Sequence, residues 1–544
     1  MAAIASGIST QRSLTALAYN PNPRRFNVSV ARAGSWCAIN PAVDDHSLDD
    51  HALSRREFLS RTAYTAGLGA AATALPADFL LKEAAAAQSR RIPLPKPRDV
   101  PIDHFVIVMM ENRSFDHYFG WLGGLADATQ RATYANPEGQ QVATRHAGSL
   151  EAPWQGCGHP DPGHGWNSGR AQLKGGFLAE GSENDEFALS YYNEGECGFI
   201  HPAAKSFTVY DRFFCSALTS TWPNRYYKWS AQAGGRKTNA PPVDTAGNQW
   251  ETIFDRALGS GLSARYYNSD LPFSAVWGAR GATWTNKLER FYADCATGTL
   301  PNISIIDPPF RDGGGGDGVS ADEHPHGDIR LGQAWMSDIV HAFMASPNYR
   351  RGALFLVYDE WGGFWDHVRP PRVPDIRANA NLEEDWGQMG FRIPAVAVSP
   401  WAAKSSNAKA RVSHATLGFE SIIKFISYRF GLGHLTVRDR YATNIGRTFD
   451  WSKPRMEPPD LPDPEQVASE PCTVGGSQTP VPQTTAETKA VHEGDLAGLE
   501  ELAYRFGVPV GDGKVDQIFT KPDALRRAIK RNKVTRTGEV STTR

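Results

Sequence analysis

The sequence has few cysteines and almost no net charge, and both shortages exclude functions. Its 544 residues carry a formal net charge of -2, so no global field attracts nucleic acid. We therefore expect no nucleic-acid partner, and any attraction to phosphate must come from local sites. The six cysteines are too widely spaced for a zinc motif, and nothing indicates a coiled coil or a repeat array. With 41% hydrophobic and 11% aromatic residues, the composition is that of a large globular chain.

A long apolar run is also missing near the N-terminus. Residues 62–81 are rich in Ala and Gly and include a proline and an aspartate, which makes this stretch too weak for a transmembrane anchor. The paired Arg55 and Arg56 precede it in SRREFL, and small residues follow it. These features are typical of a twin-arginine export signal cut near Ala87. We expect the twin-arginine machinery as a partner and a periplasmic or secreted protein.

The pairing of the cysteines stays open on the sequence alone. In an oxidising exterior, Cys157 and Cys197 could form a disulfide, because both lie in one segment of the chain. Ordinary buried thiols are the alternative.

Residues 102–110 form a nearly unbroken apolar run rich in Val and Ile, which predicts a strand buried on both faces of a parallel sheet. The next two residues, Glu111 and Asn112, fall at its carboxyl end, where open α/β sheets place ligand sites. Residues 353–358 form a second such run, which breaks into Asp359 and Glu360. If the two strands are neighbours, four oxygen ligands converge.

Such ligands suit a divalent cation: Ca²⁺, Mg²⁺, Mn²⁺ or Zn²⁺. The alternative for the two glutamates is ordinary N-capping or surface charge at strand ends.

Strands that alternate with helices favour a doubly wound, mostly parallel sheet flanked by helices. Residues 121–205 have little helical period and predict an irregular insertion over the site. The other expected strands are 263–267, 302–306 and 391–399, and the expected helices are 251–262, 284–296, 330–346 and 416–431.

A polar turn at residues 219–221 precedes Pro223, which opens a predicted helix. Thr221 has two interpretations here. It caps the helix, as most hydroxyl residues in such positions do. Alternatively, it reacts with phosphate, because the free N–H groups and positive dipole end of a helix favour a phosphate bonded to its hydroxyl.

Four ordered motifs carry a family resemblance: ENRSFDHYFG from Glu111, STWPNRYY from Ser220, DEHPHGD from Asp322 and DEWGGFWDHV from Asp359. Together they resemble the phosphoesterase family of non-specific phospholipases C and related acid phosphatases, within the alkaline phosphatase superfamily. The resemblance covers roughly residues 98–450 and implies an alkaline-phosphatase-like fold.

The resemblance implies a role for most motif residues. Thr221 is the implied nucleophile and completes the metal ligands Glu111, Asn112, Asp359 and Glu360. His164 and His324 are the implied groups for phosphate contact and leaving-group protonation, with His326 as an alternative to His324. The residues implied to orient these groups are Asn224, Arg225, Asp366 and His367.

Three tryptophans occupy variable positions of these motifs. Trp222, Trp361 and Trp365 suggest an aromatic face that contacts the quaternary ammonium of a lipid headgroup. Packing is the alternative role for the three indoles.

Composition and resemblance together divide the chain into four regions. Residues 1–87 form an export region with a long extension, 88–450 the catalytic phosphoesterase domain, 451–488 a Pro-rich linker, and 489–544 a helix and a basic tail. The tail is either solvated or binds anionic lipid headgroups.

The expected function is that of an exported, metal-dependent phosphoesterase. It hydrolyses phosphodiester lipid headgroups as a phospholipase C does, through a covalent phosphothreonine. Its expected partner is a phospholipid or small phosphate ester, with peripheral membrane contact. The alternatives are an acid phosphatase that acts on monoesters and a non-catalytic periplasmic binder of phosphate or lipid.

Overall fold

The computed structural model describes residues 93–122, 132–242, 244, 246–310, 320–403, 411–464, 467–469, 472, 496 and 498–511. The export signal with Arg55 and Arg56, most of the Pro-rich linker and the basic tail lie outside the described residues. No helix in the described part of the chain is both long enough and apolar enough to span a bilayer.

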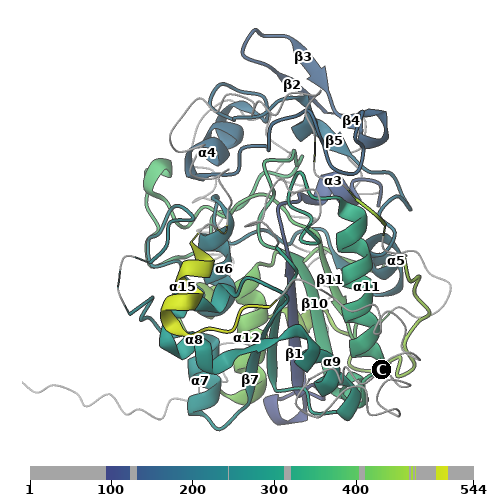
Figure 1. Cartoon of the computed structure of the whole chain (residues 1–544), viewed down its shortest axis with the longest axis vertical. Helices are drawn as coiled ribbons and strands as arrows, with labels where there is room; N and C mark the ends of the chain where they lie inside the picture. Colours follow the sequence, from purple (N-terminus) through teal and green to yellow (C-terminus); the bar gives the residue numbers. More distant parts are fainter. Residues whose placement is uncertain are drawn as a thin grey trace, which may run out of the picture. The chain divides into compact units, whose positions relative to one another are not determined.

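An eight-stranded sheet forms the centre of the fold, in the order β12-β6-β11-β10-β1-β9-β7-β8 (Figure 1). All neighbours pair in parallel except β11, which is antiparallel to both β10 and β6. This confirms the mostly parallel sheet. The strands are β1 (His104–Met110), β6 (Thr208–Tyr210), β7 (Ala264–Asn268), β8 (Thr285–Lys287), β9 (Ile303–Asp307), β10 (Gly352–Tyr358), β11 (Ala395–Val398) and β12 (Arg411–Ser413).

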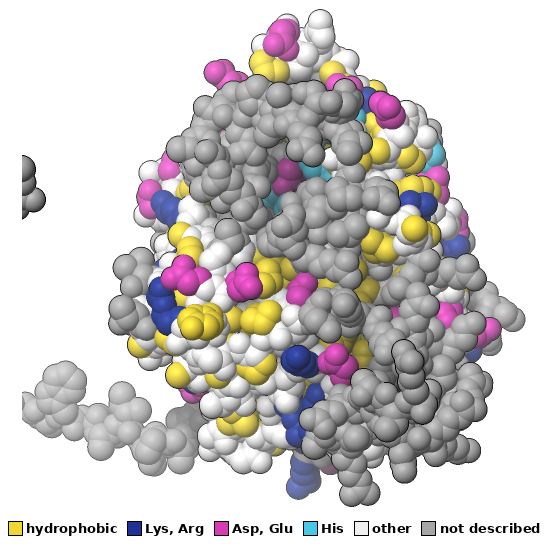
Figure 2. Space-filling view, in the orientation of Figure 1, with side chains coloured by type: hydrophobic (Ala, Val, Ile, Leu, Met, Phe, Trp, Pro, Cys, Tyr) yellow, Lys and Arg dark blue, Asp and Glu magenta, His cyan; other side chains and the backbone are white. Residues whose placement is uncertain are grey.

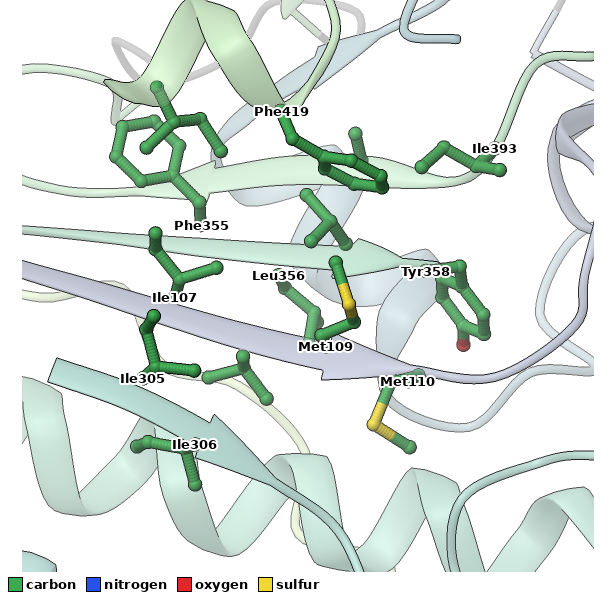
Figure 3. Close-up of a cluster of buried hydrophobic side chains, with 14 of the residues drawn as sticks. Ile107, Met109, Met110, Ile305, Ile306, Phe355, Leu356, Tyr358, Ile393 and Phe419 are labelled. Atoms are coloured by element: carbon green, nitrogen blue, oxygen red, sulfur yellow. The ribbon is translucent and has the colours of Figure 1, made fainter. Parts of the chain in front are cut away.

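Strand β1 is apolar and buried from Phe105 to Met110 because both faces of the sheet are covered. On one face, Phe105 meets the ring of Phe425 at 5.2 Å between centroids. On the other face, Tyr358 of β10 contacts Met336, with 4.0 Å between the hydroxyl and the sulfur. Figure 3 shows the buried side chains of the central strands, with Phe419 on the helix above them. A strand buried on both sides reads as a continuous hydrophobic run, as predicted.

Helices lie on both sides of β1, as a doubly wound sheet requires: α6, α7 and α12 on one side, and α9 and α11 on the other (Figure 1). Helix α12 ends at Gly431, whose φ of 68° is in the left-handed region that suits glycine. The expected helices are confirmed within a few residues. They are α6 (Thr221–Ser230), α7 (Ile253–Gly259), α9 (Leu288–Thr297), α11 (Ile329–Ala345) and α12 (Phe419–Phe430).

The insertion at residues 121–205 is not irregular throughout, which corrects the prediction. Helix α4 has a polar sequence with weak periodicity, so its stability comes from tertiary contacts. Its Arg170 donates to the carbonyls of Trp166 and Leu218 and lies 3.4 Å from the Trp166 ring centroid. The remaining elements are α3 (Phe115–Phe119), β2 (Thr133–Ala135), β3 (Gln141–Ala143), β4 (Arg145–His146), α4 (Trp166–Gly175), β5 (Ser190–Tyr191), α5 (Ile200–Ser206), α8 (Ala279–Trp284), α13 (Val437–Tyr441) and α15 (Leu499–Phe506).

A disulfide joins Cys157 to Cys472, across a sequence separation of 315. The suggested pair of Cys157 with Cys197 is therefore wrong, and Cys197 is a buried free thiol. Nearness in sequence misled the prediction, because the chain after residue 450 returns along α11. There the Ser337 hydroxyl bonds Asp463 Oδ1 at 3.3 Å.

Loss of this disulfide should destabilise the protein, because the bond restricts the unfolded chain over a long loop. We expect Cys472→Ser to lower the free energy of unfolding by about 2–4 kcal/mol. Peptide mapping without reductant should find the Cys157 peptide joined to the Cys472 peptide. As a control, a reductant should lower the stability of the wild type to that of the variant and leave the variant unchanged. A peptide that joins Cys157 to Cys197 would contradict the assignment.

Candidate active site

Strands β1 and β10 end side by side. Their register sets Met110 opposite Tyr358, so both chains leave the sheet at the same level. The Asp359 amide donates to the Met110 carbonyl at 3.0 Å, and the Asn112 amide donates to Asp359 Oδ1 at 3.1 Å. The structure thus gathers the four predicted ligands at one edge of the sheet. All four, Glu111, Asn112, Asp359 and Glu360, are fully buried.

The first and fourth motifs pack against each other through their backbones. Asn112 has a φ of 55°, a left-handed conformation that is uncommon for a residue with a Cβ atom. A Cβ atom added to Gly362 would lie 2.0 Å from the Asn112 carbonyl oxygen. Glycine at position 362 is therefore required for this close approach.

Arg225 of helix α6 reaches into this carboxylate edge. Its guanidinium lies 2.5 Å from Glu111 Oε1, 2.9 Å from Asp307 Oδ1 and 3.4 Å from Asp359 Oδ2. The Lys228 ammonium, one turn further along, lies 3.0 Å from the same Asp307 oxygen. Arg225 was predicted to orient its helix. The structure shows it in direct contact with two of the predicted metal ligands, Glu111 and Asp359.

The charges at this edge do not balance. Burial and the nearby Asp359 carboxylate hold the pKa of Glu111 well above its ordinary value. At Asp307, burial acts to raise the pKa, but the cations Lys228 and Arg225 hold it below its usual range. Burial lowers the pKa of Lys228 to about 8. Two cations therefore stand against five buried carboxyl groups, which are Glu111, Asp307, Asp322, Asp359 and Glu360.

A divalent cation fits this donor set. No described residue donates a hydrogen bond to the buried Oε2 of Glu111. The surplus carboxylates and the Asn112 amide offer the hard oxygen ligands that such ions prefer. A cation here would also relieve the repulsion that raises the pKa of Glu111.

A second acidic group lies elsewhere. Asp116, Asp366 and His367 are the one described group of at least three His, Cys, Asp or Glu residues with ligand atoms within 4.8 Å of one another. However, Arg392 donates to Asp366 Oδ1 at 2.9 Å and to Asp116 Oδ1 at 2.7 Å. A guanidinium in contact with both carboxylates opposes a second cation. The contacts instead tie the fourth motif, through Asp366 and His367, to the first motif and to Arg392.

Thr221 is the first residue of helix α6, and Ser220 holds the N-cap position. The interpretation of Thr221 as the cap is therefore wrong. Asn239 accepts a hydrogen bond from the Trp222 amide at 2.8 Å. The Asn224 side chain donates to three backbone carbonyls in the turn just before the helix, and so ties this turn to the helix. Arg225 follows Thr221 by four residues and so lies on the same helix face.

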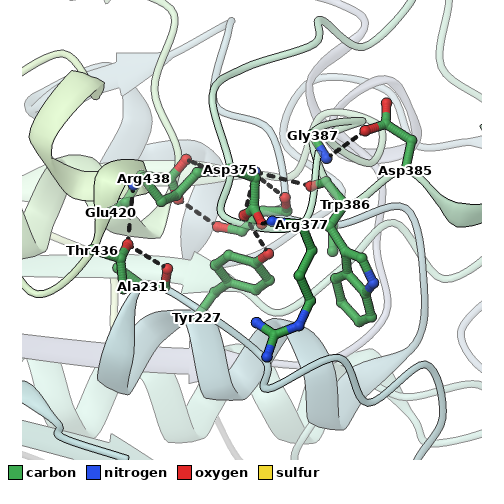
Figure 4. A network of polar contacts seen from close by, with 12 residues as sticks. Tyr227, Ala231, Asp375, Arg377, Asp385, Trp386, Gly387, Glu420, Thr436 and Arg438 are labelled. Atoms are coloured by element: carbon green, nitrogen blue, oxygen red, sulfur yellow. Dashed lines mark hydrogen bonds and ion pairs between the residues drawn. The ribbon is translucent and has the colours of Figure 1, made fainter. Parts of the chain in front are cut away.

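A second set of contacts holds helix α6, apart from those that Arg225 makes with Glu111, Asp307 and Asp359 (Figure 4). The Tyr227 hydroxyl donates to Asp375 Oδ2 at 2.7 Å, and Arg438 lies 3.2 Å from the same oxygen. Arg438 also bonds Glu420 at 3.0 Å. The position of Thr221 is thus set from two sides of its helix.

Two predicted histidines face each other near Asn112. The His164 and His324 rings lie 6.0 Å apart at nearly right angles, and both are buried. His164 Nε2 is 3.3 Å from the Asn112 side-chain nitrogen, and His324 Nε2 is 3.4 Å from an Asp161 oxygen. His326 instead bonds a backbone carbonyl at 2.8 Å. Of the two neighbouring histidines, His324 is therefore the one paired with His164.

The three motif tryptophans are fully buried and contact protein. Trp222 meets the Phe273 ring at 5.7 Å between centroids. The Trp361 indole donates to Gln172 at 2.8 Å, and the Trp365 indole donates to a backbone carbonyl at 3.2 Å. These contacts favour packing over an aromatic face for a headgroup.

Sequence reasoning missed three carboxylates of this site. Asp307 ends strand β9 at the same edge as Glu111, so the rule that selected the other strand ends could have found it. Asp161 and Asp322 belong to histidine-containing motifs and are also close to the predicted residues. In the space-filling view, acidic and histidine side chains are visible next to one another in the upper half of the molecule (Figure 2).

Known proteins with similar sequences include phospholipases C from bacteria and plants. The chain is 28% identical over 528 residues to a non-hemolytic phospholipase C of Pseudomonas aeruginosa, across 84% of this chain and 72% of that protein. It is 28% identical over 409 residues to non-specific phospholipase C1 of Arabidopsis thaliana, across 68% and 75% of the two chains.

A solved structure of a protein in the alkaline phosphatase superfamily from Vibrio parahaemolyticus aligns with 78% of this chain and 92% of its own. Its TM-score of 0.32 and 8% identity are too low to support an argument. The model of the Phosphoesterase family, in contrast, matches residues 102–433, which is more than half of the chain. The protein therefore belongs to the Phosphoesterase family and is a hydrolase that acts on phosphoric ester bonds.

Proposed function

We propose that the protein is an exported, metal-dependent phospholipase C that cleaves lipid headgroups through a phosphothreonine. The main support comes from helix α6, which begins at Thr221. Its Arg225 guanidinium lies 2.5 Å from Glu111 and 3.4 Å from Asp359. Because Arg225 lies one turn after Thr221 on the same helix face, the proposal sets the Thr221 hydroxyl and the helix N-terminus beside the carboxylate edge. The names of the phospholipase C relatives support the choice of a lipid phosphodiester.

The cation would be held by Glu111, Asn112, Asp359 and Glu360, with Thr221 beside them. When bound, it lowers the pKa of the Thr221 hydroxyl and neutralises charge on the phosphoryl oxygens. Arg225 keeps two of these carboxylates and the start of α6 in register.

The first chemical step forms a bond between Thr221 Oγ and phosphorus and breaks the bond to the leaving alcohol. The hydroxyl proton is lost to solvent before the attack. His324, oriented by Asp161, gives a proton to the leaving oxygen. His164, whose Nε2 lies 3.3 Å from the Asn112 side-chain nitrogen, is the proposed contact to a phosphoryl oxygen.

The second step hydrolyses the phosphothreonine. His324, now neutral, takes a proton from the attacking water, which forms the new bond to phosphorus. The Thr221–phosphorus bond breaks, and the threonine oxygen recovers a proton from solvent.

The Cys157–Cys472 disulfide supports export, because such bonds persist in oxidising compartments. Fractionation of cells that express the chain, with Arg55 and Arg56 intact or both changed to Lys, tests this part. Equal amounts of mature protein outside the cytoplasm in both cases would refute it.

The substrate class can be tested with two chromogenic esters. We expect a higher kcat/KM for p-nitrophenylphosphorylcholine, a diester, than for the monoester p-nitrophenyl phosphate. The opposite preference would make the protein an acid phosphatase. If the folded, metal-loaded protein hydrolyses neither of the two esters and no phospholipid in vesicles, it is a non-catalytic binder of phosphate or lipid.

Thr221→Val keeps the shape of the side chain and removes the nucleophile. We expect kcat to fall about 10³-fold or more, while folding and metal content are largely kept. Thr221→Ser should keep measurable activity. Mass spectrometry after quenching with p-nitrophenylphosphorylcholine should find a phosphocholine group on Thr221. A label on Ser220 or on a histidine would show that the nucleophile is a different residue.

Removal of the metal should abolish turnover, and its return should restore it. We expect Glu111→Gln to lower the metal content, measured by elemental analysis, because it removes a charged ligand. His367→Gln is the matched control, since it changes the Asp116–Asp366–His367 group and leaves the carboxylate edge intact. Metal lost from the His367 variant and kept by the Glu111 variant would place the ion in the other group.

A further inference from the structure

Glu323 lies between Asp322 and His324 and is strained and fully buried. Its φ of 72° is in the left-handed region, where a residue other than glycine costs energy. Burial also raises the pKa of its carboxyl group to about 7. Neither feature favours stability, so a function must account for them.

Three donors from three different elements hold the Glu323 carboxylate. The Tyr118 hydroxyl of α3 donates at 2.8 Å, and the Tyr358 hydroxyl of β10 donates at 2.5 Å. The Gln333 amide of α11 donates to the other oxygen at 2.7 Å. Tyr118 belongs to the first motif, and Tyr358 directly precedes Asp359. The carboxylate therefore joins the elements that carry the first, third and fourth motifs.

The Glu323 side chain packs against helix α11 at Gly332. A Cβ atom added to Gly332 would lie 2.2 Å from Glu323 Cγ. The Arg113 guanidinium also donates to the Glu323 carbonyl at 2.8 Å. Both the side chain and the backbone of Glu323 are thus held in place.

The neighbours of Glu323 face the site. The Asp322 carbonyl accepts a hydrogen bond from the Glu111 amide at 2.9 Å. The Asp322 side chain accepts from the His324 amide at 3.0 Å. His324 in turn lies 3.4 Å from Asp161 through its ring. A shift of the backbone at Glu323 would therefore move both the predicted acid and a predicted metal ligand.

We infer that Glu323 is a positioning residue, which holds the His324 ring in place to protonate the leaving group. The left-handed backbone turns its side chain toward α11, while Asp322 and His324 turn toward the site. The inference rests on the proposed function, because it uses the role given there to His324. It adds a residue that never contacts the substrate.

The test varies the leaving group at constant headgroup. p-Nitrophenylphosphorylcholine and soluble dihexanoyl phosphatidylcholine both carry phosphocholine, but only the second releases a basic alkoxide, which needs a proton. For Glu323→Gln, we expect kcat to fall about 10²-fold on the lipid and much less on the nitrophenyl ester, with KM nearly unchanged. Equal losses on both substrates would refute the inference.

A second variant disturbs Glu323 from the opposite side. Gly332→Ala should produce the same selective loss, because the new methyl group pushes on Glu323 Cγ. The matched control is Gly446→Ala, where a Cβ atom would lie 2.5 Å from the Phe425 ring, in the core and outside the active site. The control should lower kcat on the two substrates by the same factor, in proportion to the loss of folded protein.

A readout without turnover separates this inference from the proposed function. Histidine-labelled NMR spectra, assigned with His324→Asn, should show a changed His324 ring signal in Glu323→Gln and Gly332→Ala, and not in Gly446→Ala. An unchanged His324 signal would overturn the inference even if the wild type is an active phospholipase C. If the wild type lacks turnover but the His324 signal moves as expected, Glu323 still positions His324 and the proposed function fails.

Discussion

The excess of buried negative charge at the carboxyl end of the sheet constrains the rest of this structure. Carboxylates from β1, β9 and β10 meet there, and burying them is costly unless cations and donors compensate. Arg225 supplies one cation, and because it lies on α6, the compensation also fixes the helix that begins at Thr221. The contacts that compensate the buried charge therefore also fix the position of Thr221 at the start of its helix.

Much of this edge could be predicted from the sequence. The runs before Glu111 and Asp359 are apolar because both faces of the sheet are covered, and parallel strands end at a common edge. The same rule extends to Asp307, which the prediction passed over. The sequence could not show that Arg225 contacts Glu111, Asp307 and Asp359, because these contacts depend on how α6 packs against the sheet.

The errors have a common cause: tertiary contacts overrode local patterns. Helix α4 is polar and was read as irregular, yet Arg170 and Trp166 anchor it. The Cys157–Cys197 pair was suggested by nearness in sequence, yet Cys157 is joined to Cys472. Such partners lie far from the residue in sequence or in a different element, so no local window contains them.

The Cys157–Cys472 disulfide has a consequence for synthesis of the chain. Cys157 precedes three of the four motifs, and Cys472 follows all of them. The bond can therefore form only after the ribosome has made every residue of the four motifs. A chain that stops before residue 472 lacks the partner of Cys157, so this disulfide reports that synthesis has passed Cys472.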